Sequence, residues 1–299
     1  NCIQCNRCAY VCPHAAIRPV AMTEAEAAAA PEGMQYKDMT GMPGYKFAIT
    51  ISAYDCTGCG SCVNVCPDKI QAITMQNFEA NEAEQVYFDY GVSVPDKAEV
   101  IAKFKENSVK GSQFKQPLLE FSGACAGCGE TPYAKLITQL FGDRMYIANA
   151  TGCSSIWGGS APTTPYTTNS EGHGPAWCNS LFEDNAEFGL GMFKGVQHQR
   201  EILKGHVEAI AESDHAEAAA AAKAWLDTYN DGEASKATSA ALLAAVQGAG
   251  CEHCQYVVDH KDMLVKKSQW IFGGDGWSYD IGFGGVDHVL ASDNDVNVF

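Results

Sequence analysis

The apolar and polar positions in the second half of the chain predict alternating strands and helices. Thr131–Phe141 is predicted as a helix, because a threonine can cap its start, a proline is tolerated at the first helical position, and Gly142 ends it. Short apolar runs at Arg144–Asn149, Trp270–Asp275 and Val296–Phe299 predict strands. This order of strand, turn and helix predicts a parallel sheet with helical crossovers.

Two further stretches of this half are predicted to be helical. Asn185–Gln247 is mostly helical in pattern, with one break near Ser213 and another at Asn230–Gly232. Gly248 is a natural stop for the last of these helices. Tyr279–Ala291 is predicted as the helix that follows the strand and Gly-rich turn.

The composition excludes several classes of protein. The chain has 299 residues, of which 46% are hydrophobic and 19% charged, and this suits about two packed domains. Its net charge of −16 argues against nucleic-acid binding, which needs a basic surface. No apolar run reaches the ~18 residues of a membrane span, and no signal peptide opens the chain. We therefore expect a cytoplasmic protein with no membrane partner.

The first half is organised around two runs of cysteines with the same spacing, C-x₂-C-x₂-C-x₃-C-P. The runs are Cys2, Cys5, Cys8 and Cys12, and Cys56, Cys59, Cys62 and Cys66, each followed by proline. This is the spacing of bacterial-type ferredoxins, in which the fourth cysteine of a run ligates the other cluster. The alternative, structural zinc, needs separate tetrahedral sites that this spacing does not resemble.

We therefore assign the eight thiolates to two [4Fe–4S] clusters. Cluster A takes Cys2, Cys5, Cys8 and Cys66, and cluster B takes Cys56, Cys59, Cys62 and Cys12. The predicted organisation is an α+β two-cluster ferredoxin domain at 1–75 with an insertion at 13–55, a linker at 76–120, and an α/β parallel-sheet domain at 121–299. The first residues and the last strand look cut, so we expect both terminal domains to be truncated.

A third set of cysteines lies in the α/β half. Cys125 and Cys128 form a CxxC directly before the helix at Thr131, where helix amides stabilise thiolates. Cys153 follows the first predicted strand. Three ligands without a fourth leave a redox CxxC or a zinc site as alternatives.

The turn Gly273–Asp280 follows an apolar strand and opens a helix. Its glycines let a backbone approach a phosphate, and Asp275 is a carboxylate suited to Mg²⁺. An ordinary tight turn is the alternative. In this context the Gly-Asp-Gly sequence is similar to the motif that opens the diphosphate site of thiamine-diphosphate enzymes.

Two ferredoxin runs, then the segment 121–160, then the segment 270–292, closely resemble the pyruvate:ferredoxin (flavodoxin) oxidoreductase family. The resemblance implies oxidative decarboxylation of pyruvate with coenzyme A to acetyl-CoA and CO₂. It implies thiamine diphosphate, Mg²⁺ and three [4Fe–4S] clusters as cofactors, ferredoxin or flavodoxin as acceptor, and a homodimer. The substrate-binding residues of the family lie mostly outside this chain, so no catalytic residue is assigned.

The resemblance also implies roles for residues of the α/β half. Cys125, Cys128 and Cys153 match ligands of a proximal cluster, whose fourth cysteine lies beyond Phe299 in the family. Asp275 matches the first Mg²⁺ ligand. The turn that cradles the diphosphate in the family corresponds here to Gly274, Asp275, Gly276 and Trp277. Two further positions that contact the thiamine cofactor in the family correspond to Glu130 and Cys153.

Other readings remain open. One alternative is a non-catalytic iron–sulfur electron carrier, which would have no use for Asp275 and its turn. A second is an oxidoreductase for a related 2-oxoacid, which would differ in substrate-selecting residues that are not in this chain. A third is a zinc-binding module, which would bind no iron. The loop Thr163–Asn185 is long enough to be functional. Cys178 is expected to be a buried thiol, and Cys251-x-x-Cys254 an inert pair or a labile disulfide.

Overall fold

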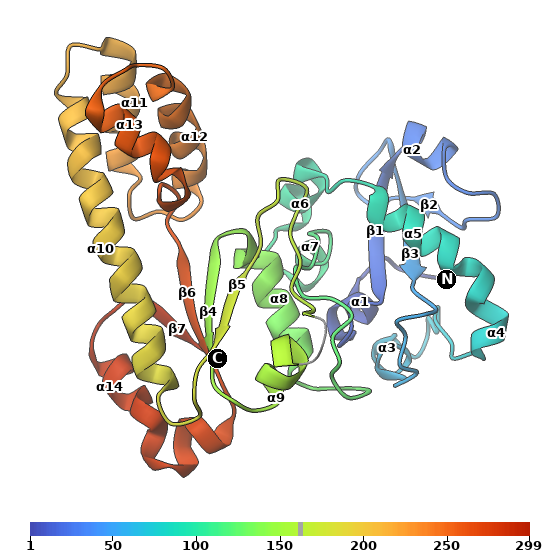
Figure 1. The fold of residues 1–299 in the computed structure, drawn as a ribbon. Helices are drawn as coiled ribbons and strands as arrows, with labels where there is room; N and C mark the ends of the chain where they lie inside the picture. Colours follow the sequence, from blue (N-terminus) through green and yellow to red (C-terminus); the bar gives the residue numbers. More distant parts are fainter. Residues whose placement is uncertain (161–163) are drawn as a thin grey trace. The chain divides into compact units, whose positions relative to one another are not determined.

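The computed structural model describes residues 1–160 and 164–299, and its contacts divide the chain into two compact units (Figure 1). Unit 1 comprises Asn1–Asp143 with Ile156–Pro175, and unit 2 comprises Arg144–Ser155 with Ala176–Phe299. The predicted domain division at residues 75 and 120 stays a prediction, since these compact units have other bounds.

Unit 1 contains a three-stranded antiparallel sheet in the order β1-β3-β2. The strands are β1 (Ile17–Thr23), β2 (Lys37–Asp38) and β3 (Tyr45–Ile51). β1 pairs with β3 along its whole length, from Ile17 opposite Ile51 to Thr23 opposite Tyr45. All of this sheet lies between the two cysteine runs, so the stretch predicted as an insertion forms the three-stranded sheet that joins the two cysteine loops.

Short helices surround the sheet of unit 1. They are α1 (Arg7–Val11), α2 (Glu24–Ala28), α3 (Ser61–Val65), α4 (Phe78–Asn81), η1 (Glu82–Glu84), α5 (Gln85–Ser93), α6 (Ala98–Phe104), α7 (Val109–Ser112), α8 (Thr131–Phe141), η2 (Gly142–Arg144) and η3 (Ile156–Ser160). The predicted helix at Thr131–Phe141 is confirmed as α8 with the same bounds, but the prediction that the threonine caps it is wrong, because Glu130 is the N-cap residue and Thr131 is the first residue of the helix. α1 contacts both α3 and α8, which places α8 beside the first cysteine run.

Residues 76–120 carry the helices α4 to α7 rather than a bare linker. α5 packs on β1 and β3, and Gly91 allows the close approach, because a Cβ there would lie 2.9 Å from Thr50 Oγ1 and Val20 Cγ2. Val100 and Phe114 are buried beside Phe47 of the sheet. The segment therefore supplies part of the apolar core of unit 1.

Unit 2 contains a four-stranded parallel sheet in the order β5-β4-β6-β7. The strands are β4 (Met145–Asn149), β5 (Ala176–Asn179), β6 (Ser268–Phe272) and β7 (Val296–Val298). In register, Ile147 of β4 faces Trp177 of β5 and Trp270 of β6, and Trp270 faces Asn297 of β7. The predicted parallel sheet and its three predicted strands are confirmed, and β5 is an additional edge strand.

Helices of unit 2 lie beside the sheet and beyond it. They are α9 (Cys153–Ser155), α10 (Asn185–Ala211), α11 (Ala216–Asp227), α12 (Ala234–Val246), α13 (Glu252–Asp259), η4 (Lys261–Met263), η5 (Gly276–Asp280), η6 (Gly282–Gly285) and α14 (Val286–Ala291). Both predicted breaks of the helical stretch are confirmed, between α10 and α11 and between α11 and α12. α10 runs from the sheet to the group formed by α11, α12 and α13 (Figure 1).

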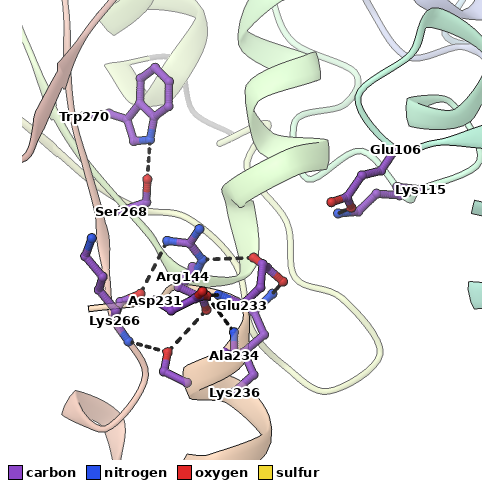
Figure 2. Close-up of polar contacts among 12 residues, drawn as sticks. Glu106, Lys115, Arg144, Asp231, Glu233, Ala234, Lys236, Lys266, Ser268 and Trp270 are labelled. Carbon is purple, nitrogen blue, oxygen red and sulfur yellow. Dashed lines mark hydrogen bonds and ion pairs between the residues drawn. The ribbon is translucent and has the colours of Figure 1, made fainter. Parts of the chain in front are cut away.

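Two features hold α10 and α12 in place within unit 2. Gly189 lets α10 approach the sheet, because a Cβ there would lie 2.4 Å from Cγ1 of Ile271. At the start of α12, Glu233 pairs with Arg144 at 3.3 Å and with Lys236 at 2.8 Å (Figure 2). Gly232 leaves the room that the Arg144 guanidinium occupies, since a Cβ would lie 2.4 Å from its carbon.

The helix predicted at Tyr279–Ala291 is wrong over its first half. The chain there forms the π-helical turn η5 and the 3₁₀ turn η6 before α14 begins at Val286. The reason is a left-handed run, with φ of 64° at Phe283, 49° at Gly284 and 78° at Gly285. A Cβ at Gly284 would lie 2.6 Å from the Trp277 carbonyl oxygen, so the chain needs a glycine at this contact.

Within the described residues, the structure has no helix that is both long enough and apolar enough to cross a bilayer.

Candidate functional site

The two cysteine runs fold into matching short helices. α1 follows Asn6, whose φ is 60°, and α3 follows Gly60, whose φ is 77°. Both helices end at a cysteine in extended conformation, Cys12 after α1 and Cys66 after α3. Because the next residue is proline in each run, the helix cannot continue and the fourth cysteine turns away from the first three.

One pocket in unit 1 brings together cysteines of both runs. Its lining includes Cys12 of the first run and, from the second run, Cys56, Cys59 and Cys62. Ile17, Met75 and Ala16 supply apolar walls. This is the set predicted for cluster B, so the fourth cysteine of one run does lie with the first three of the other. A cavity walled by four thiols and apolar groups fits a [4Fe–4S] cluster.

The cysteines of the first run also lie close together. Burial raises the pKa of the Cys8 thiol to about 12, and the negative charges of Cys2 and Cys5 add to this shift. The sulfur of Cys2 accepts a hydrogen bond from the Gln4 amide at 3.4 Å, and that of Cys66 accepts one from Ala72 at 3.3 Å. Without a cationic centre the Cys8 thiol resists ionisation, which fits a site built around iron. The joining of Cys66 to cluster A stays a prediction.

Among residues 1–160 and 164–299, no three His, Cys, Asp or Glu side chains lie close enough to hold one metal ion. A cubane differs from a single ion, since each of its four irons takes its own cysteine.

The loop carrying the third cysteine pair touches the second run. Cys125 is exposed and Cys128 half-buried, and the Cys128 amide donates to the Cys125 carbonyl at 3.0 Å. Gly127 between them has φ of 71°, and its backbone amide faces the sulfur of Cys59. A Cβ at Gly127 would lie 3.4 Å from the Cys59 Cβ. The loop therefore lies directly against a predicted ligand of cluster B.

Glu130 lies two residues further on, at the start of α8. Its pKa is raised by burial, and the Trp157 indole nitrogen donates to Oε2 at 3.2 Å, which partly offsets that effect. The charge of Glu130 also acts on Tyr166. The Tyr166 hydroxyl is buried and has no hydrogen-bond partner among the described residues. The carboxyl group of Glu130 thus stands in a partly buried environment.

In unit 2, two loops meet at the carboxyl edge of the sheet. The loop after β4 begins at Ala150, whose amide donates to the Phe272 carbonyl at the end of β6 at 2.7 Å. This loop leads to Cys153, and the loop after β6 leads to Asp275, both of which are exposed. The carboxyl ends of parallel strands are where α/β proteins bind ligands. Cys153 is in unit 2 and the Cys125–Cys128 loop in unit 1, so the three-ligand set stays a prediction.

The Gly-rich turn has an open side and a closed side. A Cβ at Gly274 would meet nothing within 4 Å, whereas one at Gly273 would lie 2.2 Å from the Trp277 ring and one at Gly276 would lie 3.0 Å from the Phe182 ring. Trp277 is 1% exposed, and its indole nitrogen has no partner among the described residues. The open Gly274 backbone beside the exposed Asp275 carboxylate fits a diphosphate with its Mg²⁺.

The sequence reasoning missed Lys135. This lysine of α8 is 2% exposed, and its ammonium donates to the backbone carbonyls of Ala9, Tyr10 and Cys12. Burial lowers the pKa of Lys135 to about 8, and the negative charge of Cys12 opposes that shift. A lysine in an amphipathic helix reads as a solvent-facing residue, so the sequence carried no signal for it.

Three other expectations concern cysteines and loops. Cys178 is exposed, so its prediction as a buried thiol is wrong, because it lies on the edge strand β5, whose residues are largely open to solvent. Cys251 and Cys254 form a disulfide at the start of α13. Of the loop predicted at Thr163–Asn185, Thr163 lies outside the described residues, and the loop contains β5.

Together, the folded cysteine runs and the parallel sheet define an iron–sulfur protein with a second, α/β unit. The model of the 4Fe-4S dicluster domain family matches residues 1–70. The chain is 52% identical over 301 residues to pyruvate-flavodoxin oxidoreductase of Klebsiella pneumoniae, and 53% identical over 309 residues to pyruvate:ferredoxin oxidoreductase of Moorella thermoacetica. It is 46% identical over 342 residues to pyruvate dehydrogenase [NADP(+)] of Cryptosporidium parvum.

These similarities cover the whole chain but only part of each relative. The chain spans 25% of the Klebsiella protein, 26% of the Moorella protein and 17% of the Cryptosporidium protein. The resemblance found in the sequence is thereby confirmed: the chain is homologous over its whole length to a segment of the pyruvate:ferredoxin (flavodoxin) oxidoreductases.

Proposed function

We propose that this chain forms the electron-exit part, and part of the cofactor site, of an enzyme that oxidises pyruvate with coenzyme A to acetyl-CoA and CO₂. Electrons leave through three [4Fe–4S] clusters to ferredoxin or flavodoxin. The observation that carries this proposal is the pocket that Cys12 of the first run shares with the three leading cysteines of the second. Identity of 52% and 53% to relatives named as pyruvate oxidoreductases supports the choice of reaction.

The cysteine runs would hold clusters A and B with the ligands assigned above. Both loops are part of one compact unit, and α1 and α3 contact each other, which supports a short distance between the two clusters. Thiolate ligation by four cysteines gives cubanes of low reduction potential, as a low-potential electron donor requires.

The loop with Cys125 and Cys128 would hold the proximal cluster, together with Cys153 and a fourth cysteine from outside this chain. The contact of Gly127 with Cys59 supports an electron path from this loop to cluster B and then to cluster A. The path would lead from the Cys125–Cys128 loop through the residues that would hold cluster B to those that would hold cluster A, and from there to the protein acceptor.

The carboxyl edge of the unit 2 sheet would take part in binding thiamine diphosphate. When bound, this cofactor supplies the electron sink needed to break the carbon–carbon bond beside the keto group. Asp275 would ligate Mg²⁺, and the backbone of Gly274 and Gly276 would approach the diphosphate. Trp277 would form the closed side of the turn, where its ring packs against Gly273. Glu130 and Cys153 would contact the cofactor.

Several finer points belong to the same proposal. A homodimer and a cytoplasmic location are implied by the family resemblance, and the choice between pyruvate and a related 2-oxoacid depends on substrate-binding residues outside this chain. A non-catalytic carrier is the competing reading, and Asp275 with its open turn is the feature that argues against it.

The proposal is tested on the full-length protein, purified without oxygen. Iron and acid-labile sulfide are quantified, EPR spectra of the reduced protein are recorded, and reduction of ferredoxin and flavodoxin is followed with pyruvate or 2-oxoglutarate plus coenzyme A. We expect three [4Fe–4S] clusters and pyruvate-dependent reduction that requires coenzyme A. Zinc in place of iron, or three clusters without any 2-oxoacid activity in thiamine-loaded protein, would refute it.

A further inference from the structure

Lys135 is a buried cation placed between the two cysteine runs. It belongs to α8, five residues after Glu130, and only 2% of it is exposed. In the described part of the chain no carboxylate forms an ion pair with it. A buried charge of this kind is costly unless other groups in the protein compensate for it.

Backbone carbonyls at the end of α1 satisfy the hydrogen-bonding capacity of Lys135. Its nitrogen lies 3.2 Å from the Tyr10 oxygen and 3.1 Å from the Cys12 oxygen, and it donates a third bond to Ala9. Three acceptors match the three N–H groups of an ammonium, whereas a neutral amine has only two. The end of a helix also favours a cation, because its last carbonyls point outward without partners. The geometry therefore selects the charged form.

The sulfur atoms that interact with this charge belong to both predicted clusters. Lys135 interacts electrostatically with Cys8, assigned to cluster A, and with Cys12, assigned to cluster B. Arg18 also interacts with Cys12, but Glu120 pairs with Arg18 and offsets its charge. Lys135 is thus a positive charge that acts on ligands of both predicted clusters, and among the described residues no carboxylate forms an ion pair with it.

We propose that Lys135 is a shared electrostatic residue that raises the reduction potentials of clusters A and B together. Reduction of a [4Fe–4S] cluster adds one electron and so one negative charge to a site that four thiolates already make anionic. A buried ammonium beside a ligand of each cluster stabilises that added charge more than a surface lysine does, because water screens it little. The inference rests on the two clusters of the proposed function.

The position of Lys135 in the chain gives this charge a second consequence. α8 begins directly after the Cys125–Cys128 loop, and Lys135 joins the same helix to the end of α1. Since Cys12 ends α1, the hydrogen bonds also hold the cysteine that passes from the first run to cluster B. Lys135 thereby fixes the position of Cys12, a predicted cluster B ligand, in addition to supplying a positive charge.

The experiment measures cluster potentials in the full-length protein by EPR-monitored titration with dithionite. Lys135→Met removes the charge and all donors, Lys135→Gln removes the charge but keeps an N–H donor group, and Lys135→Arg keeps the charge. We expect both neutral variants to move the potentials of clusters A and B negative by about 59 mV, which is tenfold in the equilibrium constant of a one-electron couple. Lys135→Arg should keep the reduction potentials of both clusters close to those of the parent protein.

Two other lysines serve as controls. Lys103 is exposed on α6, and Lys103→Met should leave both potentials unchanged. Lys110 is half-buried and interacts with Cys2 and Cys5, so Lys110→Met should affect cluster A alone. Iron and sulfide are counted in every variant, which separates two failures. Parental potentials in a fully loaded Lys135→Gln protein would overturn the inference, whereas absence of clusters from the parent protein would overturn the proposed function.

Discussion

The backbone amide of Gly127 faces the sulfur of Cys59, so the loop of the third cysteine pair lies against the second ferredoxin run. Both residues belong to unit 1. Hydrogen bonds to ligand sulfurs raise the reduction potential of an iron–sulfur cluster. The contact therefore places the loop of the predicted proximal cluster beside a ligand of cluster B, and it raises the reduction potential of cluster B.

The first prediction follows from this contact. Gly127→Ala places a Cβ 3.4 Å from the Cys59 Cβ at a residue whose φ is 71°, which costs about 1–2 kcal/mol for a residue other than glycine. We expect the loop to shift, the Gly127 amide to move away from the Cys59 sulfur and the reduction potential of cluster B to fall, as read by EPR-monitored titration. Gly123→Ala is the matched control, because a Cβ there meets nothing within 4 Å. Equal potentials in the two variants would contradict the prediction.

The second prediction concerns the exchange of ligands between the two runs. Cys12 lines one pocket with Cys56, Cys59 and Cys62, so Cys12→Ser should remove cluster B and spare cluster A. Iron and sulfide analysis should show a loss of about half of the iron of the two-cluster domain, and the EPR signal of one cluster should remain. Cys178→Ser is the control, since Cys178 is exposed on β5 and belongs to neither predicted set. Full iron content in the Cys12 variant would exclude this ligand assignment.

Asp275 carries the third prediction. It is exposed at the start of η5, so Asp275→Asn should leave the fold intact while removing the carboxylate expected to bind Mg²⁺. Calorimetry on the full-length protein should show Mg²⁺-dependent binding of thiamine diphosphate weakened by at least about tenfold. Asp293→Asn is a suitable control, because Asp293 is exposed and its φ of 53° suits asparagine. Unchanged affinity in the Asp275 variant would remove this residue from the proposed site.

The elements that could be predicted from the sequence are those whose signals are local. The spacing of the cysteines predicted the paired loops, and Pro132 and Gly142 marked the start and the end of α8. The apolar runs gave β4, β6 and β7 and their parallel order. In each case the residues that decide the structure are neighbours in the chain, so their spacing already contains the answer.

What could not be predicted depends on contacts between distant residues. The left-handed run at Phe283–Gly285 exists because the chain passes closely over Trp277, which no helical periodicity reveals. Cys178 is exposed because β5 forms the edge of the sheet, and strand order follows from tertiary packing. Lys135 is buried because α1 offers it carbonyls from more than a hundred residues away in the sequence.

The fourth prediction is a pH dependence in unit 2, at the start of α12 (Figure 2). Oδ1 of Asp231 accepts hydrogen bonds from the amides of Ala234 at 2.8 Å and Glu233 at 2.9 Å, and these bonds lower the pKa of Asp231 below its usual value of 3.8. A carboxyl group whose pKa is lower in the folded state stabilises the fold above the unfolded pKa, and this contribution is lost as the pH falls through the folded pKa.

Comparison of Asp231→Ala, Asp231→Asn and the parent protein separates the hydrogen bonds from the charge. Asp231→Ala removes both hydrogen bonds at every pH, and should lower the Tm by a few degrees. Asp231→Asn keeps an oxygen acceptor without charge, so its Tm should lie below that of the parent at pH 7 and approach it below pH 3.8. Thermal unfolding followed by circular dichroism gives both values, with Asp214→Ala, exposed between α10 and α11, as control. A deficit of Asp231→Asn that stays constant down to pH 2 would show that the charge of Asp231 does not act through these two amides.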